Sequence, residues 1–227
     1  MKISVLIPVY NERQTIEEVL KHVKATPFNK EIIVVDDGSA DSTGEFLRTL
    51  DDPEVKVFYH QRNYGKGAAL KTAIKEAQGD IVIFQDADLE YDPQEYTTLI
   101  DPIIKGMADV VYGSRMSGGR PQRVYMFWHK VGNIFLSFLT NLLYNTTLTD
   151  METGYKVFKS EIIKNLKLKS NGFCIEPEIT AKIFKRKLRV YEIPISYYGR
   201  NYSEGKKISW RQGFSAIVAL LFFRFFE

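Results

Sequence analysis

The sequence predicts an α/β fold with a mostly parallel sheet and helices on both of its faces. Two observations lead to this prediction. Short runs of β-branched and apolar residues alternate with stretches whose apolar residues have helical spacing. The runs are continuously apolar, which is typical of strands buried on both faces in βαβ units. Because no internal repeat or low-complexity linker breaks this order, we expect residues 1–210 to form one domain and residues 211–227 an appended helix.

Each expected element follows from a local pattern. Asn11 followed by Gln14 is typical of a helix start, and so are Ser39, Asp41 and Ser42 ahead of Glu45. The expected strands are ISVLIPV (3–9), EIIVVD (31–36), VKVFYH (55–60), DIVIFQD (80–86) and ADVVYG (108–113). The expected helices have apolar residues three and four positions apart within 16–23, 46–50 and 70–77.

The composition is that of a globular protein in a reducing setting. Of the 227 residues, 44% are hydrophobic and 13% aromatic, which is enough to bury a substantial core. The single cysteine, Cys174, excludes a disulfide within the chain, and no zinc-ligand spacing of Cys or His occurs. The first apolar run stops at Pro8, so we expect a strand there rather than a signal peptide. These features predict a cytoplasmic protein.

Positive charge is concentrated in the C-terminal third. Residues 1–158 carry 17 basic and 22 acidic side chains, whereas residues 159–227 carry 14 and 6, a net charge of +8. This asymmetry predicts an anionic partner for that end, such as a phosphate, a nucleic acid or an acidic membrane surface.

Polar residues follow three of the expected strands. Ligands of parallel sheets collect at the carboxyl ends of the strands, so these residues are expected to line one crevice. The run Asp36–Ser39 could also be only a turn with a helix cap. No GxGxxG or GxxxxGK[ST] loop follows the first strand, which argues against a dinucleotide-binding or P-loop enzyme. The residues are Pro8, Tyr10, Asn11 and Glu12, then Asp36 to Ser39, then Asp86 and Asp88.

Asp86 and Asp88 form the most informative pair. Two carboxylates at i and i+2 behind a buried strand repel each other and lose hydration unless a cation or hydrogen-bond donors balance them. Carboxylate oxygens with an open coordination sphere suit Mg²⁺ or Mn²⁺, which are commonly shared with substrate phosphates. A solvated acidic turn is the alternative, but the position after the fourth strand favours a metal site.

Five motifs together resemble the family 2 glycosyltransferases. They are Ile7-Pro-Val-Tyr-Asn-Glu12, Val34-Val-Asp-Asp-Gly-Ser39, Asn63-Tyr-Gly-Lys-Gly67, Asp86-Ala-Asp88 and Gly113-Ser-Arg115. Within that family the chain resembles the dolichol-phosphate mannose synthase group, which moves a sugar from a nucleotide sugar to a polyprenyl phosphate. The resemblance covers roughly residues 3–210.

The resemblance implies a GT-A fold with a nucleotide-binding sheet, and an inverting, metal-dependent transfer of a hexose from a donor of the GDP-mannose or UDP-glucose type. Asp86 and Asp88 would bind Mg²⁺ or Mn²⁺ and the diphosphate, with Glu90 as a third metal ligand where the group often carries glutamine. The implied nucleotide-binding residues are Pro8, Tyr10, Glu12, Asp36, Asp37 and Lys66.

A phosphate acceptor requires positive charge rather than a base. A phosphate monoester has a second pKa of about 6 and is already largely dianionic at neutral pH. We expect Arg115 and Arg200 to act in catalysis. The expected contacts of the acceptor phosphate are His129, Arg200, Lys206 and Lys207. Asp150 and Glu152 could orient the cationic residues, or an acid of this segment would be the base if the acceptor were a hydroxyl group.

Two segments are candidates for lipid contact. Residues 214–226 have only Ser215 and Arg224 as polar interruptions. A helix of about 20 Å cannot cross a hydrocarbon core of about 30 Å, so we expect it to lie on the membrane surface. The aromatic segment 124–144 is the second candidate, with a core or dimer-packing helix as the alternative. We therefore expect a peripheral protein on the cytoplasmic face of the membrane, without a nucleic-acid partner.

Three other functions compete with this one. A family 2 enzyme could act on a hydroxyl acceptor in polysaccharide or glycolipid synthesis, although Ser209-Trp-Arg-Gln212 stands where processive synthases carry Gln-x-x-Arg-Trp. A nucleotidyltransferase would need a phosphate-binding glycine loop after the first strand. A non-catalytic membrane adaptor gives no reason for Asp86 and Asp88. The nucleotide, the sugar and the prenyl chain depend on pocket shape, which these motifs do not specify.

Overall fold

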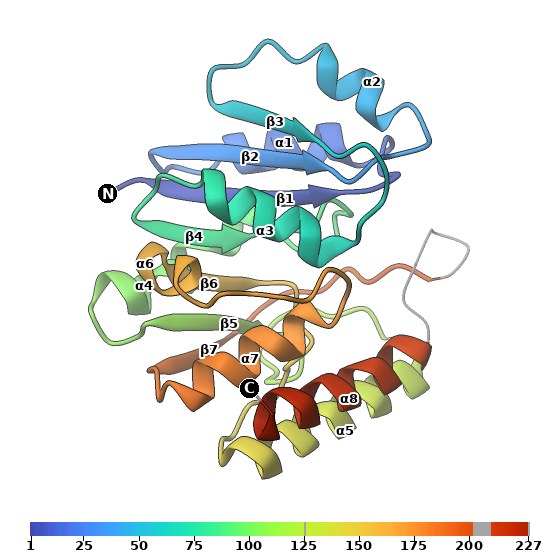
Figure 1. The fold of residues 1–227 in the computed structure, drawn as a ribbon. Coiled ribbons are helices and arrows are strands. Elements are labelled where there is room, and N and C mark those ends of the chain that lie inside the picture. The colour runs from blue at the N-terminus through green and yellow to red at the C-terminus, as the bar shows by residue number, and fades with distance from the viewer. Residues whose placement is uncertain (125, 202–209, 227) are drawn as a thin grey trace.

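The computed structural model describes residues 1–124, 126–201 and 210–226, and a seven-stranded sheet forms its centre (Figure 1). The strand order is β3-β2-β1-β4-β6-β5-β7. Only β6 runs antiparallel to its neighbours β4 and β5. The strands are β1 (Ile3–Val9), β2 (Lys30–Asp36), β3 (Val55–Tyr59), β4 (Ile81–Phe84), β5 (Val110–Ser114), β6 (Lys156–Lys159) and β7 (Val190–Pro194). The predicted mostly parallel sheet is confirmed.

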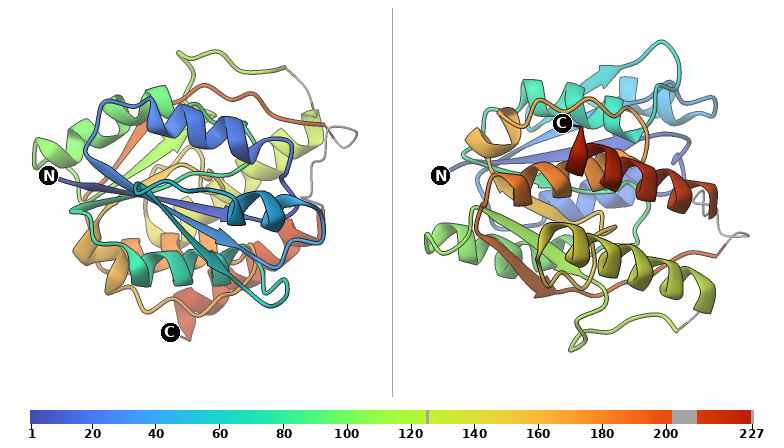
Figure 2. Two further views of the ribbon diagram at one scale, coloured as in Figure 1. Left: turned by 90° about the horizontal axis from the view of Figure 1, so that it is seen from above. Right: turned by 60° about the horizontal axis from the view of Figure 1, so that its bottom comes forward.

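Helices cover both faces of this sheet, as predicted (Figure 2). On one face α1 (Ile16–Lys24) and α4 (Tyr96–Ile104) pack on the sheet. The other face carries α3 (Lys66–Glu76), α6 (Ser160–Lys164) and α7 (Ile175–Lys185). The short helices α2 (Thr43–Arg48) and η1 (Pro93–Glu95) complete this part of the fold.

Two further helices lie side by side at one end of the molecule (Figures 1 and 2). They are α5 (Phe127–Tyr144) and α8 (Trp210–Phe225), and with α7 they form a third apolar cluster. The Tyr144 hydroxyl donates a 2.7 Å hydrogen bond to the Leu220 carbonyl. Within the described ranges, no helix combines the length and apolar character needed to cross a bilayer.

The predicted start of the first helix is wrong in detail. Thr15 occupies the N-cap position of α1, whereas Asn11 lies in the left-handed region with φ of 52°. The Asn11 side chain instead accepts a 2.7 Å hydrogen bond from the backbone N–H of Ala40. It thereby joins the loops that follow β1 and β2. Ser42 does stand at the N-cap of α2, although its side chain makes no capping bond.

Candidate active site

A pocket of about 1250 Å³ opens at the carboxyl ends of β1, β2 and β4 and extends to α5 and α8. Most of the residues predicted from sequence line it. Asp36 is not among the described lining residues, and Lys206 and Lys207 lie outside the described part of the chain. The predicted residues in the lining are Pro8, Tyr10, Glu12, Asp37, Lys66, Asp86, Asp88, Glu90, Arg115, His129 and Arg200.

Asp37 organises the expected nucleotide end of the pocket. Its buried carboxylate accepts hydrogen bonds from the backbone N–H groups of Tyr64, at 3.0 and 3.2 Å, and Gly65, at 2.7 Å. His60 Nδ1 lies 2.6 Å from Asp37 Oδ1. Gly65 has φ of 101°, and a Cβ there would lie 2.6 Å from the Asn171 carbonyl, so only glycine fits. Asp37 thus fixes the turn that presents Lys66.

Asp36 stabilises a turn, which the sequence left open as the alternative to nucleotide binding. Its side chain is buried, and Oδ1 accepts a 3.0 Å hydrogen bond from the backbone N–H of Ser39. Aspartate side chains commonly stabilise a turn by accepting a hydrogen bond from a backbone N–H a few residues further along the chain. The structure therefore gives Asp36 a local partner, while its predicted nucleotide contact stays a prediction.

The acidic turn after β4 is paired with cations. Lys66 Nζ lies 2.7 Å from Asp86 Oδ1, and Arg200 Nη2 lies 3.3 Å from Asp88 Oδ2. Glu90 accepts hydrogen bonds of 2.7 Å from the Tyr197 hydroxyl and from the Arg200 backbone N–H. Leu89, with φ of 60°, reverses the chain between Asp88 and Glu90. Across the described ranges, no three His, Cys, Asp or Glu side chains are arranged as a ready-made metal site.

Arg200 joins two residues to which the sequence gave separate roles. Its guanidinium forms a bidentate pair with Glu12, with both N···O distances 3.0 Å. Glu12 was expected at the nucleotide and Arg200 at the acceptor phosphate. In the structure they meet beside the acidic turn, so the two residues with separate predicted roles form one ion pair.

Negative charge is in excess at this end of the pocket. Among the described residues around the acidic turn, four carboxylates are paired with two cations, Lys66 and Arg200, and Lys66 also pairs with Glu176. Burial raises the pKa of Asp88 to about 7, and the charges of Glu90 and Asp86 add to the effect. Such a set of carboxylate oxygens fits a hard divalent cation such as Mg²⁺ or Mn²⁺. The four carboxylates are those of Glu12, Asp86, Asp88 and Glu90.

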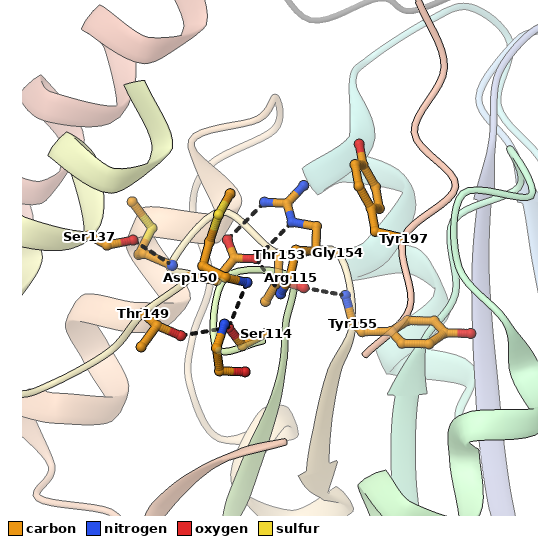
Figure 3. Close-up of polar contacts among 12 residues, drawn as sticks. Ser114, Arg115, Ser137, Thr149, Asp150, Thr153, Gly154, Tyr155 and Tyr197 are labelled. Carbon is orange, nitrogen blue, oxygen red and sulfur yellow. Dashed lines mark hydrogen bonds and ion pairs between the residues drawn. The ribbon is translucent and has the colours of Figure 1, made fainter. Parts of the chain in front are cut away.

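Arg115, which also lines the pocket, is held by Asp150 (Figure 3). Its Nε and Nη2 donate hydrogen bonds of 2.7 and 2.8 Å to the Asp150 carboxylate, and its backbone N–H adds one of 2.9 Å. The guanidinium carbon lies 5.1 Å from the centre of the Tyr197 ring. Asp150 is fully buried, with an exposed fraction of 0%. Asp150 therefore orients a cation and is not available as a base in this arrangement.

Three residues that carried no predicted binding role complete the site. Lys156 Nζ lies 2.5 Å from Glu176 Oε2, and Glu176 Oε1 lies 3.2 Å from Lys66 Nζ. Lys66 is therefore shared between Asp86 and Glu176. Glu152 lines the pocket, and burial raises its pKa to about 7, with the charge of Glu176 adding to the effect. The sequence had indicated Glu152, beside Asp150, as a residue that could orient the cations or act as a base, but no motif marked Glu176 at the start of α7.

The far end of the pocket is aromatic and basic. Its lining includes Trp128, His129 and Lys130 from the first turn of α5, together with Arg123 and residues of the first turns of α8. Arg123 Nη1 donates a 3.0 Å hydrogen bond to the Gly199 carbonyl. The first turns of both helices thus border the same cavity. The backbone N–H groups at a helix start favour negative charge nearby.

Comparison with known proteins identifies the family. Residues 4–167 match the family described as Glycosyl transferase family 2. The chain belongs to this family. As a glycosyltransferase it is confirmed to be an enzyme, which excludes the non-catalytic adaptor and argues against a nucleotidyltransferase.

The relatives agree with the predicted group. The glycosyltransferase is 31% identical over 240 residues to UDP-N-acetylglucosamine–dolichyl-phosphate N-acetylglucosaminyltransferase of Methanococcus voltae. The match covers 96% of this chain and 94% of that protein. It is 32% identical over 217 residues to dolichol-phosphate mannosyltransferase of Pyrococcus furiosus, over 91% of this chain and 59% of that longer protein.

Solved structures confirm the predicted GT-A fold. Glucosyl-3-phosphoglycerate synthase from Mycobacterium tuberculosis, in complex with Mn²⁺, UDP and glucosyl-3-phosphoglycerate, has a TM-score of 0.74 at 21% identity, over 98% of this chain and 80% of that one. A structure of the same synthase with Mg²⁺ and UDP also has a TM-score of 0.74, at 22% identity, over 98% and 79% of the two chains.

Proposed function

We propose that this glycosyltransferase moves a hexose from a nucleoside diphosphate sugar to a polyprenyl phosphate at a membrane surface, with inversion at the anomeric carbon. One observation carries the proposal. A single pocket joins the carboxylates behind β4 to the aromatic and basic first turns of α5 and α8. It therefore offers a place for a metal-bound diphosphate at one end and an anionic lipid headgroup at the other. The names of the relatives from Methanococcus voltae and Pyrococcus furiosus support the same acceptor class.

On the donor side, the nucleoside would lie along Pro8, Tyr10 and Asp37, and Asp86 and Asp88 would hold Mg²⁺ or Mn²⁺ with the diphosphate. A divalent cation bound there would stabilise the charge that develops on the leaving diphosphate. Lys66, 2.7 Å from Asp86, is close enough to pair with a diphosphate oxygen as well. Glu90 stays a predicted third ligand, although its present partners are Tyr197 and Arg200.

On the acceptor side, the chain needs to neutralise a phosphate dianion and aim one of its oxygens at the anomeric carbon. Arg115, locked by Asp150, presents a fixed positive charge to the pocket. His129 and the N–H groups at the start of α5 supply further donors in this proposal, and Arg200, Lys206 and Lys207 stay predicted partners of the phosphate. Because the phosphate is already ionised, no residue has to remove a proton.

The membrane context rests on the surface of α5 and α8. Side chains spaced along one stripe of each helix are exposed although they are large and apolar. We propose that these stripes contact the cytoplasmic face of the membrane, so that the prenyl chain stays in lipid while its phosphate enters the pocket. The exposed residues are Phe127, Val131, Ile134, Phe135, Phe138 and Leu142 of α5, and Phe214, Val218, Leu221, Phe222 and Phe225 of α8.

Transfer assays test the proposal. The purified chain, Mg²⁺ or Mn²⁺, and a panel of UDP- and GDP-sugars are incubated with a polyprenyl phosphate in detergent micelles. We expect a glycosylated polyprenyl phosphate with at least one donor, and loss of product when a chelator removes the metal. A chain that glycosylates a water-soluble hydroxyl acceptor and leaves polyprenyl phosphate unmodified would contradict the proposal and favour the hydroxyl-acceptor alternative.

A further inference from the structure

Glu152 carries a buried oxygen that lacks a hydrogen-bond partner. Glu152 lines the pocket, and its Oε1 is inaccessible to solvent and unpaired among the described residues. Buried polar atoms in proteins almost always have a partner, because an unpaired one costs about 1 to 3 kcal/mol. An unpaired carboxylate oxygen in a ligand pocket therefore indicates a donor that the protein itself does not provide.

The nearest buried cation is already committed. Lys156 Nζ has three N–H donors, and the structure gives them three acceptors: the Met151 carbonyl at 3.2 Å, the Thr153 carbonyl at 2.5 Å and Glu176 Oε2 at 2.5 Å. Lys156 thus holds the backbone on both sides of Glu152 without satisfying Oε1. This bonding pattern fixes the backbone that carries Glu152 before any ligand enters.

The position of Glu152 relates it to one part of the substrate. Its charge interacts with those of Glu176 and Arg115. Glu176 pairs with Lys66 next to Asp86, at the proposed diphosphate end, and Arg115 belongs to the proposed acceptor end. The backbone nearby also touches the acidic turn, because a Cβ at Gly154 would collide with Asp86 Oδ2. The transferred sugar has to lie between the leaving diphosphate and the entering phosphate.

We infer that Glu152 accepts a hydrogen bond from a hydroxyl group of the transferred sugar and so helps to select the sugar. This inference rests on the proposed function. Glu152 acts here as an oxygen acceptor for an O–H donor, and no proton is transferred. A site built to bond a hydroxyl group rejects the analogue that lacks it, because the buried oxygen is then left unpaired.

Calorimetry with Glu152→Ala and Glu152→Gln tests the inference. The probes are UDP-glucose, UDP-N-acetylglucosamine and GDP-mannose, each compared with its free nucleoside diphosphate. For the donor that the wild-type chain binds, we expect Glu152→Ala to weaken binding about 10-fold or more and to leave binding of the free diphosphate unchanged. Glu152→Gln keeps an acceptor oxygen and should retain most of the affinity.

A matched control separates this effect from a disturbed backbone. Glu192 accepts hydrogen bonds from the backbone N–H groups of Thr149 at 2.9 Å and Asp150 at 3.1 Å, outside the pocket lining as described. Glu192→Gln should leave the ratio of sugar-nucleotide to diphosphate affinity at the wild-type value. Equal ratios in wild type and Glu152→Ala would overturn the inference.

Deoxy and deoxyfluoro donors give a second test that holds even if Glu152→Ala does not fold. In the wild-type chain, removal of one particular hydroxyl group should weaken donor binding far more than removal of the others, and Glu152→Gln, which keeps an acceptor oxygen, should show the same selective loss. If removal of every hydroxyl group weakened binding by one common factor, in wild type as in Glu152→Gln, the inference would be overturned. It would also be overturned if Glu152→Gln bound the donor normally but had a greatly reduced kcat and an altered pH profile, because that result indicates a base. A wild-type chain that binds no nucleotide sugar contradicts the proposed function instead.

Discussion

At the scale of single residues, Asp88 has the environment expected of a metal ligand. Its carboxylate is surrounded by Asp86 and Glu90, and Arg200 is 3.3 Å away. Asp88→Asn keeps the shape of the side chain and removes its charge. We expect metal-dependent donor binding to weaken and transfer to fall about 100-fold or more, as when one stabiliser of the developing charge is lost. Donor titrations with and without Mn²⁺ measure the first effect, and wild-type turnover at saturating Mg²⁺ would refute the metal assignment.

Asp37 gives a second prediction at this scale. The sequence predicted a contact with the base or ribose, but three bonds from Tyr64 and Gly65 show that it also fixes the turn carrying Lys66. Asp37→Ala should release this turn and raise the donor KM about 10-fold, since each bond to a charged group contributes about 1.5 to 3 kcal/mol. An unchanged KM together with a lower melting temperature would limit Asp37 to a structural role.

The sequence could predict those residues of the candidate site that lie in local motifs. Asp37, Asp86 and Asp88 closely follow strands, so chain order placed them at one sheet edge, whereas Lys66 was predicted from the resemblance to family 2 glycosyltransferases. The pairing of Arg200 with Glu12 could not be predicted, because 188 positions separate the two residues and only the folded chain brings them together. Glu176 was missed for the same reason.

At the scale of elements, the five expected strands agree with β1 to β5 within two residues, and the helix expected at 16–23 agrees with α1, whereas α2 and α3 begin three and four residues before the expected 46–50 and 70–77. The strands β6 and β7 were not predicted. β6 has only four residues, KVFK, and its first, Lys156, is fully buried although it is charged. Its partners β4 and β5 are antiparallel to it and distant in sequence. A lysine in the core and a non-local pairing both hide such a strand from any periodicity argument.

Glu31 in β2 makes stability depend on pH. Burial acts to raise its pKa, but hydrogen bonds from Ser4, Gln78, Lys56 and Lys2 outweigh burial and lower it from 4.5 to about 2. The bonds join β2 to β1 and β3. Because the folded-state pKa is the lower one, this stabilisation is complete above about pH 5 and is lost as the pH falls towards 2, with a magnitude of up to about 3 kcal/mol.

Glu31→Gln tests this dependence. Chemical denaturation at pH 7 should show the variant less stable than wild type, and the difference should shrink steadily between pH 5 and pH 2. The exposed Glu17→Gln in α1 serves as the control and should show no such pH dependence. A difference that stays constant over this range would show that Glu31 stabilises the sheet by packing rather than by charge.

At the scale of the whole molecule, one pocket extends from the carboxyl edge of the sheet, which carries the candidate site, to α5 and α8, whose outer stripes are apolar. Residues 159–227, which include α7 and α8, have a net charge of +8. The predicted helix at 211–227 is part of this arrangement: Leu220 and Ala216 are buried against α7 and α5. Removal of α8 would therefore expose the core, so point substitutions are the cleaner test of the membrane role.

Phe138 of α5 and Phe222 of α8 are 62% and 47% exposed, and they lie on the stripes proposed to contact lipid. Burial of such a side chain contributes about 1.5 to 3 kcal/mol, so Phe138→Glu or Phe222→Glu should each weaken association with vesicles containing an anionic lipid about 10-fold or more. Donor binding should stay at the wild-type level, because both side chains lie outside the pocket lining as described. Ile104→Glu, at an apolar position 54% exposed at the end of α4, is the matched control and should bind vesicles normally.

Co-sedimentation with vesicles measures the association of each variant, and high salt separates the contribution of apolar side chains from that of basic side chains. Equal loss in Ile104→Glu would mean that the effect comes from added negative charge, and unchanged binding in all three variants would mean that the membrane meets another surface.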